Sequence, residues 1–227
     1  MLLYYITDRK QFAGGGGARE TALLDKIAEA AHCGIDFIQL REKDVSGHQL
    51  EVLAHAAVRA VRENSAAERK SATRILINSR ADVAIVCGAD GVHLTSMDID
   101  PAIARSVWPC DAGALSAISG QAAPREKGRP VVTLSCHSER EVARAASSCA
   151  DFAVFAPVFE KRDSPHVRPA GLETLRNVCR QNIPVIALGG ITLENARQCV
   201  EAGAAGIAGI RLFQENDIAS IVRQLRD

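Results

Sequence analysis

Short apolar runs rich in β-branched residues alternate with longer amphipathic segments along the whole chain. The apolar runs predict eight strands, over residues 2–7, 37–41, 74–78, 91–94, 131–135, 152–156, 185–188 and 206–210. The amphipathic segments predict helices over residues 20–33, 47–63, 79–87, 139–148, 171–181, 192–202 and 218–226. The helix after the seventh strand has the clearest ends, because Thr192 is a suitable N-cap and Gly203 a suitable stop.

Eight strand–helix units in 227 residues are typical of an α/β fold, a single (β/α)8 TIM barrel. A doubly wound sheet is the alternative, and it fits less well because the strand pattern shows no clear switch point. No linker divides the chain, so one TIM-barrel domain is expected over residues 1–227. The glycine run 14–17 and the stretch 110–129 are expected to be loops; the glycine run is either a connector or a flap over the top face. The sequence leaves open whether either loop closes over a site.

Composition narrows the class of protein. With 47% hydrophobic and 24% charged residues, the chain has ample material for a large core. Its 27 Lys and Arg balance 27 Asp and Glu, which argues against nucleic acid and anionic membranes as partners. The seven cysteines form no CxxC pair, which favours reduced thiols. The first residues lack signal-peptide features and no apolar run reaches membrane-spanning length, so a cytoplasmic location is expected.

A histidine follows the fifth predicted strand. Period-2 alternation puts Thr133, Ser135 and His137 on one face, with His137 at the carboxyl end, where α/β barrels place their chemistry. Histidine titrates near neutral pH, so His137 is a candidate for proton transfer. The alternative is a histidine held by hydrogen bonds at a strand end. His93, inside the fourth strand, is expected to serve packing or a hydrogen bond.

Two cations and an amide end the second predicted strand. Gln39, Arg41 and Lys43 share one parity, so all three gather at the barrel mouth if that face points inward. Arginine and lysine there suit a phosphate or a diphosphate. The alternative is a charged loop paired internally with Glu42 or Asp44.

Glycines follow the last two predicted strands. Gly189 and Gly190 lie between the seventh strand and a helix, and Gly209 and Ile210 end the eighth strand. Glycine lets backbone N–H groups approach a ligand closely, and in many barrels these two loops bind phosphate. The alternative is that the glycines only form tight turns.

Seven motifs, in this order, resemble the thiamin phosphate synthase and TenI family. They are YITD from Tyr5, QLREKD from Gln39, LIN from Leu76, GVHL from Gly91, SCHS from Ser135, FAPVF from Phe155 and ALGGI from Ala187. The resemblance covers nearly the whole chain, and the ordered set is specific. It implies a (β/α)8 barrel that acts on phosphorylated thiazole and pyrimidine precursors of thiamin, in a family whose barrels are often homodimers.

The synthase branch of this family joins a pyrimidine diphosphate to a thiazole phosphate with magnesium, for which it uses two aspartates. The matching positions here are Ser79 and Asp98. Serine is a poor replacement for a carboxylate ligand of Mg²⁺, so half of the acidic site is missing. The loop 160–166 also departs from the synthase pattern, because it lacks the threonines that hold the diphosphate, although Lys161 or Arg162 could partly substitute.

The TenI branch resembles the chain better at His137, because a histidine follows the fifth strand in its thiazole tautomerases. Such isomerases move a proton on carboxythiazole phosphate and need no metal or other cofactor. The resemblance is therefore interpreted as a TenI-like thiazole tautomerase of thiamin biosynthesis. In this interpretation the neutral imidazole of His137 accepts a proton and its cation returns one. The expected partner is a small phosphorylated thiazole.

The residue pattern and the resemblance together give an expected site with His137 as its catalytic residue. The expected substrate contacts are Gln39, Arg41, Lys43, Asn78 and Ser135. The expected phosphate contacts are Gly189, Gly190, Gly209, Ile210 and Arg211, although Arg211 could instead face solvent. No metal ligand is expected, except Asp98 in a synthase.

Two other functions stay open on the sequence alone. A thiamin phosphate synthase with an altered site would have to hold Mg²⁺ with Asp98, Asn78 and water. A noncatalytic binder of thiazole or thiamin phosphates, with a regulatory role, would explain intact phosphate loops beside the loss at Ser79. The retained His137 argues against the binder.

Overall fold

Eight parallel strands close into a barrel, as the sequence predicts. The computed structural model describes residues 1–65, 72–108, 129–160 and 166–226. Each strand pairs with the next in chain order, and β8 pairs with β1. The strands are β1 (Leu2–Ile6), β2 (Phe37–Leu40), β3 (Arg74–Asn78), β4 (Gly91–Leu94), β5 (Val131–Cys136), β6 (Phe152–Phe155), β7 (Val185–Leu188) and β8 (Gly206–Gly209).

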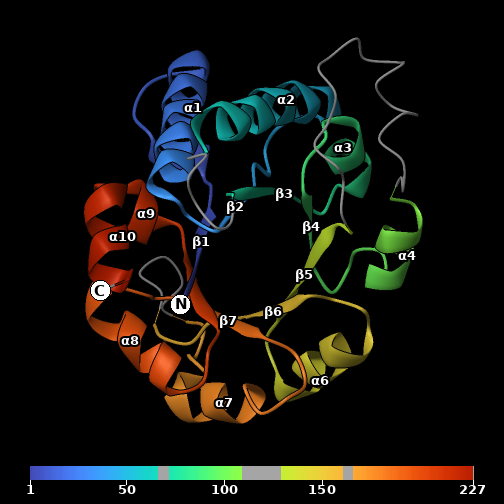
Figure 1. Cartoon of the computed structure of the whole chain (residues 1–227), viewed down its shortest axis with the longest axis vertical. Helices are drawn as coiled ribbons and strands as arrows, with labels where there is room; N and C mark the ends of the chain where they lie inside the picture. Colours follow the sequence, from blue (N-terminus) through green and yellow to red (C-terminus); the bar gives the residue numbers. More distant parts are fainter. Residues whose placement is uncertain (66–71, 109–128, 161–165, 227) are drawn as a thin grey trace.

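Helices surround the barrel (Figure 1). Their apolar faces pack on the outward side chains of the strands and form the larger of the two apolar clusters. The helices are α1 (Gly16–Cys33), α2 (Gly47–Asn64), α3 (Ala81–Val86), α4 (Pro101–Ser106), α6 (Glu139–Ser147), α7 (Gly171–Val178), α8 (Leu193–Glu201), α9 (Arg211–Gln214) and α10 (Ile218–Arg226). None of the helices described here is both long and apolar enough to cross a membrane.

The glycine run is partly helical, which corrects the prediction of a loop over 14–17. Gly15 is the N-cap of α1, and Gly16 and Gly17 lie in its first turn. Glycine is a poor helix former, but burial of the apolar face of α1, with Leu23 and Ile27 fully buried, stabilises the helix as a whole. The second predicted loop, 110–129, lies outside the described residues except for Arg129.

The sequence pattern misses three short elements. These are the 3-10 helix η1 (Arg9–Gln11), with three residues, α4 with six and α9 with four. Elements this short do not complete two helical turns, so apolar periodicity cannot indicate them.

The interior of the barrel is packed with side chains. Tyr4, Phe37 and Phe152 meet in edge-to-face contacts, with ring centroids 5.7 and 5.3 Å apart. They belong to a cluster that also contains Ile6, Leu76, Val131, Val154, Ile186 and Ala208. Farther along the strands the inward positions become polar, at residues such as Gln39 and His93. This change places the polar groups toward the carboxyl ends of the strands, where barrel enzymes bind their substrates.

At the opposite end, one contact recurs around the barrel. An aspartate stands directly before β2, β4 and β6, namely Asp36, Asp90 and Asp151. Each carboxylate accepts a hydrogen bond of 2.7 to 2.8 Å from a backbone N–H in the preceding strand; the donors are Leu3, Ile75 and Val132. Ala205 occupies the same place before β8. A carboxylate therefore ties β1 to β2, β3 to β4 and β5 to β6, whereas β7 and β8 have no aspartate at this place.

Each of these aspartates also binds an arginine from a helix. The guanidinium groups of Arg226, Arg62 and Arg105 lie 2.6 to 2.9 Å from the carboxylates of Asp36, Asp90 and Asp151, respectively. Each arginine also donates to a backbone carbonyl near the same strand, as Arg62 does to Gly88. These contacts fasten the outer helices to the amino-terminal end of the barrel and leave the carboxyl end for binding.

Candidate functional site

A buried amide begins the polar mouth of the barrel. Gln39, on β2, is only 1% exposed, and its Nε2 donates to Oδ1 of Asn78 at the end of β3 over 2.8 Å. Its Oε1 is buried and has no hydrogen-bond partner among the described residues. A buried amide oxygen without a donor is costly, so this atom is suited to accept a hydrogen bond from a ligand. The structure thus brings together two of the predicted substrate contacts.

A chain of hydrogen bonds runs from Asn78 to Asp98. Nδ2 of Asn78 donates to Oγ of Ser79 over 3.0 Å, and Ser79 donates to Oδ2 of Asp98 over 2.8 Å. Thr95 adds two donors to that same carboxylate oxygen, its N–H at 2.7 Å and its hydroxyl at 2.8 Å. Ser79 has a φ of 60°, in the left-handed region that non-glycine residues seldom adopt. The backbone therefore holds Ser79 in an uncommon conformation that aims its hydroxyl at Asp98.

His93 lies inside the barrel, between two hydroxyl groups. Its Nδ1 is 2.8 Å from Oγ1 of Thr133, and its Nε2 is 2.8 Å from Oγ of Ser135. Burial, with a smaller contribution from the positive charge of Arg41, lowers the pKa of His93 to about 4. His93 is therefore neutral at pH 7 and carries one N–H, so it donates to one hydroxyl and accepts from the other. Ser135, a predicted substrate contact, is oriented by this neutral imidazole.

The expectation that His93 serves packing or a hydrogen bond is confirmed, because the residue is buried and hydrogen-bonded. The structure shows that it makes two hydrogen bonds and fixes Ser135. Its register with Asn78 on β3 and with Thr133 on β5 places it inside the polar mouth. Its alternation with the apolar residues Val92 and Leu94 was the one sequence signal that His93 lies on the other face of the strand.

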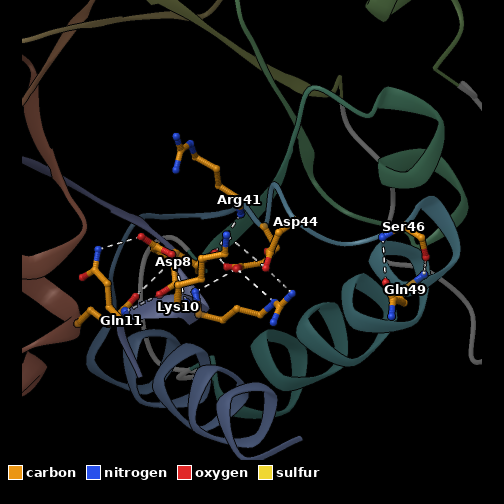
Figure 2. Close-up of polar contacts among 11 residues, drawn as sticks. Asp8, Lys10, Gln11, Arg41, Asp44, Ser46 and Gln49 are labelled. Carbon is orange, nitrogen blue, oxygen red and sulfur yellow. Dashed lines mark hydrogen bonds and ion pairs between the residues drawn. The ribbon is translucent and has the colours of Figure 1, made fainter. Parts of the chain in front are cut away.

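Arg41 and Lys43 do not pair with their neighbours in sequence. The described residues show Asp44 paired instead with Arg9 and Lys10, at 3.0 and 3.5 Å. Figure 2 shows the Arg41 side chain pointing away from Asp8, Lys10 and Asp44. Arg41 is half-buried and Lys43 is exposed. Among the described contacts Glu42 and Asp44 pair with Arg9 and Lys10, and the charge of Arg41 acts on His93; a ligand role for Arg41 and Lys43 stays a prediction.

The predicted phosphate loops lie side by side, because β7 and β8 pair up to Leu188 and Ala208. Gly190 has a φ of 65°, and a Cβ there would lie 2.4 Å from the carbonyl oxygen of Glu160. Glycine is therefore required at 190 both for its backbone conformation and for the close approach of another loop. This requirement supports the turn interpretation, and it leaves phosphate binding as a prediction.

Ile210 and Arg211 continue the second of these loops. Ile210 precedes α9, and Arg211 is the first residue of that short helix. Nε of Arg211 lies 3.5 Å from a carboxylate oxygen of Glu215, and about a third of the Arg211 side chain, 30%, is exposed. Gly209 ends β8 and is buried. The two alternatives for Arg211, phosphate or solvent, are both compatible with this half-buried position.

His137 lies on the rim between β5 and β6. Its ring Nδ1 donates to the carbonyl oxygen of Ala156 over 2.8 Å, and its backbone N–H donates to the carboxylate of Glu141. The residue as a whole is exposed. Because a carbonyl only accepts, Nδ1 carries a proton and Nε2 is the nitrogen left for other contacts. In the described part of the chain, no hydrogen bond joins His137 to the group formed by Gln39, Asn78 and Asp98.

Comparison with known proteins agrees with this architecture. A family model described as thiamine monophosphate synthase matches residues 3–112 and 119–213. A protein of Aquifex aeolicus named "Putative thiamine-phosphate synthase 2" is 37% identical over 214 residues, 94% of this chain and 97% of its own length. The thiamine-phosphate synthase of Syntrophomonas wolfei is 31% identical over 227 residues, 99% of this chain and 94% of its own length. The solved thiamine phosphate pyrophosphorylase of Pyrococcus furiosus has a TM-score of 0.73 at 26% identity, covering 99% of this chain and 93% of its own.

These names contradict the predicted activity. The expectation of a thiazole tautomerase, an isomerase with His137 as its proton carrier, is wrong, because relatives at 31% and 37% identity over nearly the whole chain are named synthases, which are transferases. The sequence interpretation gave too much weight to the loss of one carboxylate at Ser79. A magnesium ion that is also bound by substrate phosphates needs only one or two carboxylates from the protein. The loss at Ser79 therefore does not rule out synthase chemistry.

Proposed function

Because the chain belongs to the thiamine monophosphate synthase family, we propose that it is a thiamin phosphate synthase, a transferase that joins a pyrimidine diphosphate to a thiazole phosphate. The observation that carries the proposal is the polar cluster of Asn78, Ser79 and Asp98 at the mouth of the barrel. It adjoins the cationic end of β2, so ligands for a metal ion and for a diphosphate lie on the same side of the mouth.

The polar cluster fits a magnesium ion that is shared with the substrate. Asp98 uses Oδ2 for its three hydrogen bonds, and its Oδ1 has no partner among the described residues. In the described part of the chain, no group of three or more His, Cys, Asp or Glu side chains is arranged to hold a metal ion. The protein therefore supplies the Asp98 carboxylate and the Ser79 hydroxyl oxygen, whereas the amide oxygen of Asn78 accepts a hydrogen bond from Gln39. Mg²⁺ commonly completes such a set with water and substrate phosphates. A bound Mg²⁺ would neutralise charge on the departing diphosphate.

The cations that follow β2, Arg41 and Lys43, act on the departing diphosphate in this proposal. Coupling releases diphosphate, so negative charge grows on the leaving group, and a preorganised guanidinium stabilises it without rearrangement. We assign this role to Arg41, whose charge acts on His93 in the barrel mouth; Lys43 lies two residues further along, exposed to solvent. The two substitutes considered for the missing threonines, Lys161 and Arg162, lie outside the described residues.

The remaining predicted contacts divide between the two substrates. In this proposal Gln39, Asn78 and Ser135 hydrogen-bond the polar edge of a ring, because they present amide and hydroxyl groups from the barrel interior. The loops with Gly189, Gly190, Gly209 and Ile210, together with Arg211, hold the phosphate of the thiazole. The anions then lie at two separate places on the mouth, one beside β2 to β4 and one beside β7 and β8.

Incubation of the purified protein with both substrates and Mg²⁺ tests the proposal. We expect thiamin phosphate and diphosphate to form in equal amounts, and both to fall together in the Asp98→Asn variant. Absence of both products at high enzyme concentration, from protein that is folded and binds the substrates, would mean a noncatalytic binder and would remove the proposal.

A further inference from the structure

The loop after β1 and the loop after β2 are joined by a buried carboxylate. The Glu42 side chain is only 1% exposed. Its Oε1 accepts a hydrogen bond of 2.6 Å from the hydroxyl of Thr7, and its Oε2 accepts one of 3.0 Å from the backbone N–H of Arg9. Burial raises the pKa of Glu42, whereas the hydrogen bonds from Thr7 and Arg9 lower it. The carboxylate is thus fixed by donors from the neighbouring loop.

The Thr7 hydroxyl connects this carboxylate to Arg41. Thr7 donates its proton to Glu42, and its oxygen accepts the backbone N–H of Arg41 over 2.9 Å. The backbone N–H of Thr7 donates to the carbonyl of Gln39, on the same neighbouring strand, over 3.0 Å. Thr7 is fully buried. The backbone on both sides of position 40 is therefore held by one threonine.

The acidic residues after β2 and the Arg41 cation point in different directions. The acidic residues Glu42 and Asp44 face the cations of η1, with Arg9 3.7 Å from the first and 3.0 Å from the second. Arg41 turns the other way, as Figure 2 shows, and its charge reaches His93 inside the mouth. No carboxylate of the described residues forms an ion pair with Arg41. Glu42 and Asp44 are therefore neutralised by the cations of η1, and the charge of Arg41 is available to bind a ligand.

We propose that Thr7 and Glu42 are positioning residues for Arg41: the Thr7 hydroxyl, held by the Glu42 carboxylate, fixes the backbone of Arg41 so that its guanidinium meets the diphosphate at the barrel mouth. The identity of this anion rests on the proposed synthase function. The positioning itself rests on the hydrogen bonds among Thr7, Arg41 and Glu42. Neither Thr7 nor Glu42 touches the ligand in this scheme, so both act only through Arg41.

Inorganic diphosphate with Mg²⁺, titrated calorimetrically into the intact protein, tests the inference without requiring turnover. Thr7→Val keeps the shape of the side chain and removes the hydroxyl; we expect it to weaken diphosphate binding about tenfold, whereas Thr7→Ser binds within about twofold of the wild type. Arg41→Ala should lose at least as much affinity as Thr7→Val. The double variant should bind no more weakly than Arg41→Ala alone, because a residue that acts through Arg41 has no effect once the guanidinium is gone.

The control is Asp90→Ala, which removes a similar bridging carboxylate at the far end of the barrel. We expect it to lower the unfolding midpoint and leave diphosphate affinity unchanged. Glu42→Gln serves as a second variant if Thr7→Val does not fold, with the same non-additivity toward Arg41→Ala. The inference is overturned if wild-type protein does not bind diphosphate, if folded Thr7→Val binds it normally, or if its loss adds in full to that of Arg41→Ala. Normal diphosphate results with no coupling activity would instead remove the synthase proposal alone.

Discussion

The hydroxyl of Ser79 donates a 2.8 Å hydrogen bond to Oδ2 of Asp98, so the end of β3 is tied to the loop after β4. The Ser79 hydroxyl is a neutral donor, whereas a carboxylate at position 79 would repel that of Asp98. Asp98 therefore supplies the negative charge of this cluster alone. The affinity of the free protein for Mg²⁺ should then be low, and it should rise when diphosphate brings its own oxygens.

Ser79→Asp tests this consequence directly. We expect Mg²⁺ to bind the free variant at least about tenfold more tightly than the wild type, because two carboxylates then share the ion. Aspartate tolerates the left-handed conformation of position 79, so the backbone should persist. Calorimetric titration with Mg²⁺ measures the change, and Ser79→Asn is the matched control without the charge. An equal gain in Ser79→Asn, or none in Ser79→Asp, would contradict the assignment of Asp98 as a metal ligand.

The buried His93 predicts a pH dependence of folding stability. Its pKa is about 4 in the folded protein, against a reference of 6.5, so between these values the unfolded chain binds a proton that the folded chain does not. The free energy of unfolding therefore falls as pH falls through this window, and the loss ends below pH 4. From pH 7 to pH 5 the expected loss is about 2 kcal/mol.

Urea unfolding of the wild type and of His93→Gln at pH 7 and pH 5 isolates this contribution. Glutamine does not titrate and can hydrogen-bond both Thr133 and Ser135. Between pH 7 and pH 5 the wild type should lose more free energy of unfolding than the variant. The other titrating groups are the same in both proteins, so their contributions cancel in this comparison. The same difference at both pH values would show that His93 titrates normally in the folded protein.

The barrel itself could be predicted because two local signals agree at each strand. The run 74–78, for example, is apolar at its three central positions, contains two isoleucines and is followed by a helix-like segment, and the structure has a strand over the same residues. The helices α4 and α9 have six and four residues and no longer amphipathic segment around them, whereas α3, also with six, lies within the predicted helix 79–87. The glycine run was read as a loop because propensity is local, whereas the burial that stabilises α1 depends on tertiary packing.

The site was predictable only in part, for a different reason. Parity grouped Gln39 with Arg41 and Ser135 with His137 but left the direction of each face open; the structure finds Gln39 and Ser135 in the polar mouth. The contacts of Arg9 with Glu42 and Asp44 could not be predicted, because they join two loops that meet only when β1 and β2 pair. Whether a charged residue is free for a ligand depends on such contacts, and no periodicity within one strand encodes them.

The recurring aspartates predict a stability effect at the amino-terminal end of the barrel. Asp90→Ala removes the acceptor of the Ile75 N–H and the partner of Arg62, so we expect a loss of about 2 kcal/mol in the free energy of unfolding. Asp82→Ala removes an aspartate that pairs with an exposed arginine, Arg80, and should cost less than about 1 kcal/mol. Urea unfolding compares the two. Equal losses would mean that the bridge to the backbone contributes nothing beyond a surface ion pair.

Alanine substitutions at two glycines with positive φ distinguish the cost of backbone strain from the cost of a steric clash at the predicted phosphate loop. Gly190→Ala combines a φ of 65° with a Cβ 2.4 Å from the Glu160 carbonyl oxygen, whereas Gly171→Ala has a φ of 79° and no atom within 4 Å of its Cβ. Gly171→Ala should therefore cost only the backbone term, about 1 kcal/mol. Gly190→Ala should cost more, because the loops must move apart. That movement should also weaken the binding of thiazole phosphate, measured calorimetrically, while Gly171→Ala binds it normally. If both variants lose the same stability and neither loses affinity, the approach of the two loops has no part in holding the phosphate.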